Sequence, residues 1–156
     1  MAFAQKPCSS PIYRQFDFWL GEWEVFNKDG TKNGESKISL MLDSCVVFEE
    51  FVSANITRGI RYAGNSFNVY NPATKQWQQT WVDNIGEPSE YMKGKYEDKK
   101  IILQTNPVVF SKDTLAVRRL TYYDLGKDKV RVQGEISKDN EKTWVTEYDL
   151  EYRRKK

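Results

Sequence analysis

Apolar and polar side chains alternate along most of the 156 residues of this chain. A period of two is typical of β-strands that bury one face. Turn-forming pairs interrupt the alternation at short intervals, as at Asp29-Gly30, Asn33-Gly34, Gly64-Asn65 and Asn71-Pro72. The pattern predicts strands at 22–26, 34–42, 45–53, 57–63, 66–70, 77–83, 90–96, 100–105, 115–123, 130–137 and 143–152.

Hairpin-length connections between successive strands favour an all-β, up-and-down antiparallel arrangement. About ten such strands predict a closed barrel, because closure removes the exposed edges that an open sheet would leave. A β-sandwich is the alternative architecture. Ahead of the first strand, Phe16, Trp19 and Leu20 have helical spacing and predict a short helix within 11–20 that caps one end of the barrel.

Composition and charge narrow this picture. Aromatic residues make up 14% of the chain and apolar residues only 39%, so most strands must carry one polar face. The length fits one domain, which we place at 11–156 after an N-terminal arm at 1–10. The net charge of +2 is spread along the chain, which is atypical of a nucleic-acid-binding surface. We expect neither nucleic-acid binding nor a membrane span, and either a monomer or a homodimer.

The hairpin at 66–83 has an unusual pattern. One face of each of its strands combines large aromatic rings with hydrogen-bonding groups, which is typical of a small-molecule cavity rather than of an aliphatic core. If the intervening apolar residues point outward, these side chains line the barrel interior; the reverse phase is the alternative. Asp83, at the strand end, could instead cap a turn. The candidates for binding a ligand are Asn68, Tyr70, Trp77, Gln79, Trp81 and Asp83, with Ser66 on the same face.

The chain contains no histidine. This excludes a haem held by an imidazole, histidine-ligated metal sites, and Ser-His or Cys-His catalysis. The sequence also lacks an Asp-rich loop of the kind that binds calcium. We therefore expect no cofactor and no metal.

The first residues indicate export. Ala2-Phe3-Ala4 has the small-x-small form that precedes a signal-peptidase cleavage site. Cys8 and Cys45 lack the spacing of a zinc site, and a disulfide is their simplest use. Two separate buried thiols are the alternative. These features favour a periplasmic or secreted protein.

The segment F-D-F-W-L-G-E-W-E-V at 16–25 resembles the opening signature of a bacterial family of unknown function, grouped with the calycin or lipocalin-like barrels. R-Y-A-G-N-S-F-N-V-Y, W-Q-Q-T-W-V-D and V-R-V-Q-G-E-I-S follow in that family's order. The resemblance implies a barrel of about ten strands around an internal cavity, usually in exported proteins, and no established activity. At Gln78 this sequence departs from the family, whose members often carry histidine there.

The resemblance also places a glutamate in the strand at 130–137. Gln133 and Glu135 alternate there with apolar residues, and Gly134 between them would allow the strand to bend. We therefore add Gln133 and Glu135 to the cavity candidates. A stripe that faces solvent is the alternative.

Two functions fit these candidates, and we favour the first. A binding barrel would stack a small, partly aromatic ligand on its aromatic side chains and orient the ligand with amides and a carboxylate. The alternative is a cofactor-free acid-base enzyme, lyase- or hydrolase-like, that acts on a small aromatic substrate. Phenolic acid decarboxylases, which are also calycin-like barrels, use such chemistry, and the catalytic candidates here are Arg61, Tyr70, Asp83 and Glu135. A barrel filled by side chains would instead favour a structural role.

Overall fold

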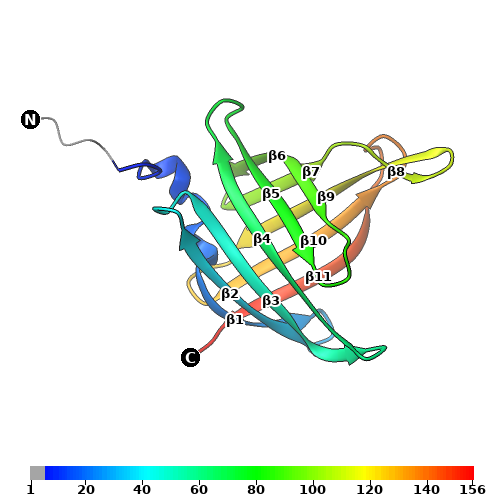
Figure 1. The fold of residues 1–156 in the computed structure, drawn as a ribbon, viewed down its shortest axis with the longest axis horizontal. Helices are drawn as coiled ribbons and strands as arrows, with labels where there is room; N and C mark the ends of the chain where they lie inside the picture. Colours follow the sequence, from blue (N-terminus) through cyan, green and yellow to red (C-terminus); the bar gives the residue numbers. More distant parts are fainter. Residues whose placement is uncertain (1–5) are drawn as a thin grey trace, which may run out of the picture.

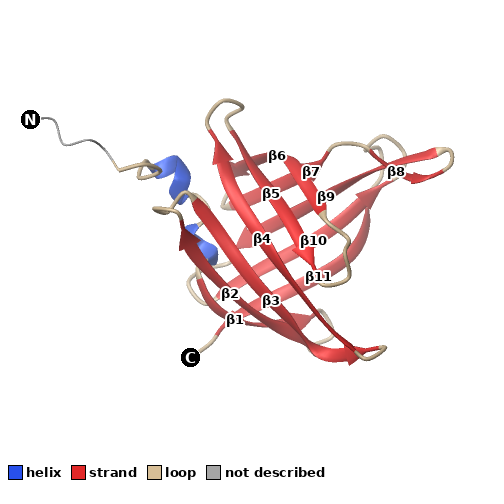
Figure 2. Ribbon diagram, in the orientation of Figure 1, coloured by secondary structure: helices blue, strands red, loops and turns tan. Residues whose placement is uncertain are grey.

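The computed structural model describes residues 6–156, so the predicted cleavage motif Ala2-Phe3-Ala4 lies outside the described residues. Two short 3-10 helices, η1 (Pro11–Arg14) and η2 (Asp17–Trp19), precede the strands (Figure 2). The strands are β1 (Gly21–Asn27), β2 (Lys32–Met41), β3 (Val46–Thr57), β4 (Ile60–Asn71), β5 (Gln76–Asp83), β6 (Ser89–Glu97), β7 (Lys100–Thr105), β8 (Val108–Ser111), β9 (Thr114–Asp124), β10 (Lys129–Ser137) and β11 (Val145–Arg154).

Ten of these strands close into an antiparallel barrel, as the sequence predicted (Figure 1). From β1 to β7 each strand pairs with the next along the chain, and β7 then pairs with β9 in place of β8. β9, β10 and β11 continue the order, and pairing of β11 with β1 closes the ring. Val25 on β1 lies opposite Tyr152 on β11 at this closure. Among the described strands, β8 pairs with β9 alone, and the two project from the barrel as a hairpin that the sequence did not predict (Figure 1).

The helical segment fills one end of the barrel, which confirms the predicted cap. Phe16 and Trp19 are fully buried, and the ring of Phe16 lies 5.4 Å from that of Trp77 and 4.9 Å from that of Tyr122. The indole Nε1 of Trp23 on β1 donates to the Trp19 carbonyl across 2.8 Å. We refer to Pro11–Trp19 as the plug. One end of the barrel is therefore packed with aromatic side chains.

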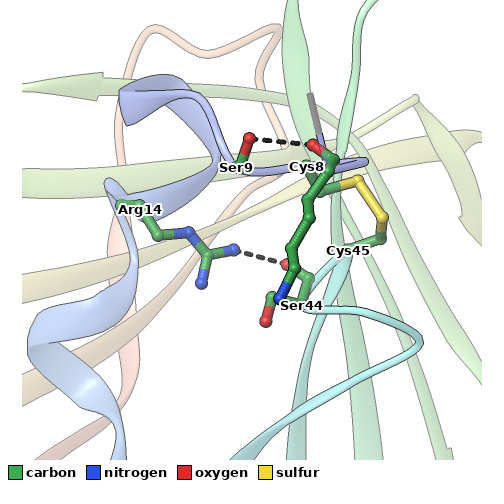
Figure 3. Close-up of a disulfide and its surroundings, with 6 residues drawn as sticks. Cys8, Ser9, Arg14, Ser44 and Cys45 are labelled. Carbon is green, nitrogen blue, oxygen red and sulfur yellow. Dashed lines mark hydrogen bonds between the residues drawn. A yellow bond between two sulfur atoms is a disulfide. The ribbon is translucent and has the colours of Figure 1, made fainter. Parts of the chain in front are cut away.

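The predicted disulfide between Cys8 and Cys45 is confirmed (Figure 3). It joins the N-terminal arm to the turn between β2 and β3, with a Cα–Cα distance of 5.0 Å. Arg14 of the plug donates to the carbonyl oxygen of Ser44 in the same turn. Both contacts hold the plug at one end of the barrel. Within residues 6–156, no helix has the length and apolar character required to cross a membrane.

Two predicted turns are in fact strand positions. Asn33-Gly34 lies in β2 and Gly64-Asn65 in β4, and the turn between β3 and β4 occurs at Arg58-Gly59, where both residues have positive φ. The predicted strands at 57–63 and 66–70 are thus largely one long strand. Gly34 and Gly64 serve packing instead, because a Cβ at either position would overlap an aromatic ring of the neighbouring strand.

Candidate ligand-binding cavity

A cavity of about 650 Å³ opens at the end of the barrel opposite the plug. β5 shows its orientation: Trp77, at the start of the strand, contacts the plug, whereas Trp81 and Asp83 farther along line the cavity. Tyr122 lines the cavity and packs on Phe16 and Trp19, so the plug closes its base. Its aromatic walls are Phe51, Tyr62, Trp81, Tyr91, Tyr122, Tyr148 and Tyr152.

Three of these rings lie over glycines of adjacent strands. Phe51 covers Gly34, Trp81 covers Gly64, and Tyr148 covers Gly134, in each case so closely that a Cβ would overlap the ring. A glycine lets a ring lie close to the backbone of the wall. The glycines thereby help to keep the barrel interior open at this end.

The base of the cavity holds a buried carboxylate that is not among the residues predicted from the sequence. Glu49 on β3 is 3% exposed. Its Oε1 accepts hydrogen bonds from Ser36 Oγ at 2.7 Å and Tyr152 OH at 3.2 Å, and its Oε2 accepts one from Ser66 Oγ at 3.1 Å. Burial raises the pKa of Glu49 to about 7, although the three hydroxyls act in the opposite direction. Glu49 therefore changes charge near neutral pH.

The position of Glu49 follows from strand alternation. Val47, Glu49 and Phe51 point inward from β3, whereas Glu50 is exposed. Val47 is buried in the core nearer the plug, and Phe51 and Ser53 line the cavity farther out. The sequence gives only a weak signal that Glu49 is buried. A single glutamate between two apolar positions is also found on strands at the edge of a sheet, where it faces water.

A chain of hydrogen bonds through two side-chain amides connects Glu49 to the opposite wall of the cavity. Gln79 on β5 donates through Nε2 to the hydroxyl of Tyr122 at 2.8 Å and to Oδ1 of Asn68 at 2.7 Å. Asn68 donates to Ser66 Oγ at 2.9 Å, and Ser66 donates to Glu49. Gln79 lines the cavity, whereas Asn68 is fully buried behind it. Asn68 therefore orients the polar groups of the cavity and does not form its surface.

Asp83 combines the two roles that the sequence left open. It lines the cavity, and its Oδ2 accepts hydrogen bonds from Tyr62 OH at 3.1 Å and Trp81 Nε1 at 3.3 Å. Its Oδ1 caps the turn after β5 by accepting the amides of Ile85 and Glu87, both at 3.1 Å. Partial burial acts to raise the pKa of Asp83, but these hydrogen bonds outweigh it and lower the pKa.

Arg118 and Glu147 form a two-bond ion pair in the cavity wall. The Nε and one terminal nitrogen of Arg118 on β9 lie 2.9 and 3.2 Å from the two carboxylate oxygens of Glu147 on β11. The hydrogen bond to Glu147 raises the pKa of Arg118 further. The positive charge of Arg118 is thus already compensated by a neighbour.

Two predicted aromatic candidates lie at the plugged end. Trp77 is 2% exposed, and its Nε1 donates to Gln15 Oε1 at 3.0 Å. Tyr70 packs between Tyr13 and Trp77, with ring centroids 5.5 and 5.9 Å away. Neither lines the cavity, because the plug occupies the part of the interior that both face.

Three further candidates lie outside the cavity. Gln133 and Glu135 point to the outer face of β10. Val132 and the positions that alternate with them along the strand are buried and face the barrel interior. Glu135 pairs there with Arg119 at 2.9 Å, and Gln133 accepts a hydrogen bond from Tyr123. Arg61 is exposed and donates to the carbonyl oxygens of Ser53 and Ala54. Of the four catalytic candidates, only Asp83 lines the cavity.

Comparisons with known proteins add no functional assignment. No protein-family model matches the sequence, and no curated protein matches it. Among residues 6–156, no group of three or more acidic or cysteine side chains is arranged to hold a metal ion. The chemistry of the site must therefore be inferred from the cavity itself.

Proposed function

We propose that this protein binds a small, partly aromatic molecule in the cavity of its barrel. The observation that carries this proposal is the 650 Å³ cavity, whose walls combine aromatic rings with a few positioned polar groups. Its volume falls in the range of small-molecule sites, roughly 300 to 1,000 Å³. The glycines beneath Phe51, Trp81 and Tyr148 support the same conclusion, because they leave room inside the barrel.

The proposal includes export to the periplasm or the cell exterior. The Cys8–Cys45 disulfide supports it, because such bonds persist in oxidising compartments and are rare in the cytosol. The likeness of the motif at 16–25 to a family of exported lipocalin-like barrels is a second support. Fractionation of cells that express the native gene tests this part independently of binding, and recovery of the protein in the cytosol would contradict export.

A titration with a neutral aromatic fluorophore, N-phenylnaphthylamine, tests the binding function. Entry into the cavity predicts a saturable rise in probe fluorescence and quenching of tryptophan emission. Trp81→Leu should weaken the binding at least fivefold, because Trp81 forms part of the wall. Trp144→Leu is the matched control, since Trp144 lies outside the cavity against Arg119 and its loss should leave affinity unchanged. Equal affinity for wild type and Trp81→Leu would reject the cavity as the binding site.

Acid-base catalysis is a second candidate, and Glu49 is the observation that favours it. A carboxyl group with a pKa of about 7, open to a cavity, is suited to both donate and accept a proton at neutral pH. The test is turnover of small aromatic esters and phenolic acids by wild type and Glu49→Gln. Turnover that Glu49→Gln abolishes, and that the outer-face control Glu135→Gln retains, would establish the enzyme.

A further inference from the structure

The cavity has a charge opposite to that of the whole protein. Its lining contains four carboxylates, Glu49, Asp83, Glu87 and Glu147, and one basic side chain, Arg118. The chain as a whole has a net charge of +2. Basic residues are thus scarce in the lining of this cavity, although they are in excess over the chain as a whole. A concave surface with one sign of charge concentrates ligands of the other sign.

The carboxylates differ in how well they are compensated. Glu147 has the guanidinium of Arg118, and Asp83 has two backbone amides, a phenol and an indole. Glu49 is the deepest and has only the neutral hydroxyls of Ser36, Ser66 and Tyr152. Among the described residues, no lysine or arginine forms an ion pair with it. When ionised, Glu49 is a buried negative charge without a counter-ion, which is costly.

The surroundings of Glu49 suit a cation. Tyr152 contacts its carboxylate, and Tyr122, Tyr148 and Trp81 line the same cavity. Aromatic rings attract cations through their electron-rich faces, and cages of aromatic rings recognise ammonium groups. A carboxylate beside such rings adds a charge of the opposite sign. An anionic ligand would instead meet four carboxylates and a single arginine that is already paired.

We propose that the cavity selects a small organic cation, whose ammonium group pairs with Glu49 at the base and whose apolar or aromatic body lies along Trp81 toward the opening. This inference rests on the proposed binding function and specifies the chemical class of the ligand. The bound ammonium supplies the counter-ion that Glu49 lacks in the protein alone.

Three probes of similar shape test the charge preference: phenethylammonium, phenethyl alcohol and phenylacetate. Calorimetric titration near pH 8 should show phenethylammonium binding roughly tenfold to hundredfold more tightly than the alcohol, which is the usual gain of a hydrogen bond between charged groups. Phenylacetate should bind most weakly. Equal or tighter binding of the alcohol or phenylacetate would overturn the cation assignment.

Glu49→Gln preserves the shape of the side chain and removes its charge. It should abolish the preference for phenethylammonium over phenethyl alcohol, because an amide has no charge to pair with an ammonium group. Glu135→Gln is the matched control, because Glu135 lies on the outer face and pairs with Arg119. A preference for the cation that survives in Glu49→Gln would assign the selectivity to the carboxylates nearer the opening and contradict the proposal.

The pH dependence of the wild-type protein gives a second readout that requires no variant. Glu49 must be ionised to pair with a cation, and its pKa is about 7, so affinity for phenethylammonium should rise between about pH 5.5 and about pH 8.5, by up to roughly thirtyfold. The phenols of Tyr122, Tyr148 and Tyr152 face Glu49 and stay neutral in this range, as phenols ordinarily titrate near 10. Ser36 on β2 and Ser66 on β4 contribute no charge.

Asp83, Glu87, Arg118 and Glu147 are the other charged groups of the cavity, and they remain in Glu49→Gln. The part of the pH profile that disappears in this variant therefore belongs to Glu49. A flat profile in wild type would overturn the inference. Binding of the neutral alcohol and N-phenylnaphthylamine without any preference for the cation would reject the inference and leave the binding function standing. If none of the probes binds, both fail.

Discussion

The hydroxyl of Tyr152 on β11 donates to the carboxylate of Glu49 on β3 across 3.2 Å, and the two residues are separated by 103 positions in the sequence. This hydrogen bond crosses the base of the cavity. It joins a strand near the start of the barrel to the last strand, so closure of the barrel completes the environment of Glu49.

The pH dependence of stability should reveal Glu49. Burial raises its pKa from 4.5 to about 7 on folding, so the folded state binds the proton more tightly than the unfolded state. The stabilisation is fully present below pH 4.5 and is lost as the pH rises to about 7, by roughly 2 to 4 kcal/mol. Urea unfolding of wild type and Glu49→Gln at several pH values isolates this contribution, because all other carboxyl groups are shared.

Glu49→Gln should therefore lose less stability than wild type between pH 4.5 and 7. Identical pH profiles for the two proteins would show that Glu49 does not titrate in this range. The pKa values of Glu35 and Asp139 are both lowered to about 2, so these two groups act only at more acidic pH. Their effect has the opposite sign, because the stabilisation they provide is lost as the pH falls.

Gly64→Ala should disturb the cavity wall. The new methyl group would overlap the Trp81 ring, which would have to move into the cavity, at a cost of roughly 1 to 3 kcal/mol. The binding of N-phenylnaphthylamine should weaken in parallel. In the double variant Gly64→Ala with Trp81→Leu, the clash disappears, so the two free-energy changes of unfolding should be clearly less than additive. Strict additivity would mean that Gly64 and Trp81 do not interact.

Gln79 and its neighbour Gln78 provide a matched pair on opposite faces of β5. Gln79→Met removes the donor that joins Tyr122 to Asn68, leaves polar groups unpaired in the interior, and should cost about 1 to 3 kcal/mol. Gln78→Met removes only long hydrogen bonds of 3.3 Å outside the cavity and should cost less than about 1 kcal/mol. Chemical unfolding of both variants measures the difference, and equal costs would refute the proposed network.

Loss of the disulfide should destabilise the fold by about 4 kcal/mol, as expected from chain entropy for a bridge that spans 37 residues. Replacing Cys8 and Cys45 together by serine should produce this loss in thermal unfolding. A reducing agent should lower the melting temperature of wild type and leave that of the double variant unchanged. If the reducing agent lowered the melting temperature of both proteins equally, its effect would not come from the disulfide.

The barrel and the face on which most candidates lie could be predicted from alternation alone. The side chains of Gln79, Trp81 and Asp83 reach the cavity as the hairpin pattern predicted. Trp77 and Tyr70 share their inward face but lie beside the plug. A period of two identifies the face of a strand and gives no information about which end of the barrel is filled.

The two errors among the acidic residues have a common origin. Glu135 lies on the polar face of a strand whose other face is apolar, and the apolar face, which includes Val132, faces the interior. Glu49 lies between Val47 and Phe51, which resemble ordinary core positions, with Glu50 beside it as the exposed neighbour. Burial of a carboxylate depends on hydroxyl partners from β2, β4 and β11, which only the closed barrel brings together.

The most direct test of the binding cavity is nuclear magnetic resonance of the indole N–H groups of the 5 tryptophans during titration with N-phenylnaphthylamine. Binding in the cavity predicts a large, saturable shift of the Trp81 signal, assigned by its absence in Trp81→Leu, with little change at Trp144. A shift at Trp144 without one at Trp81, or no shift at any indole, would contradict a ligand-binding cavity in this barrel.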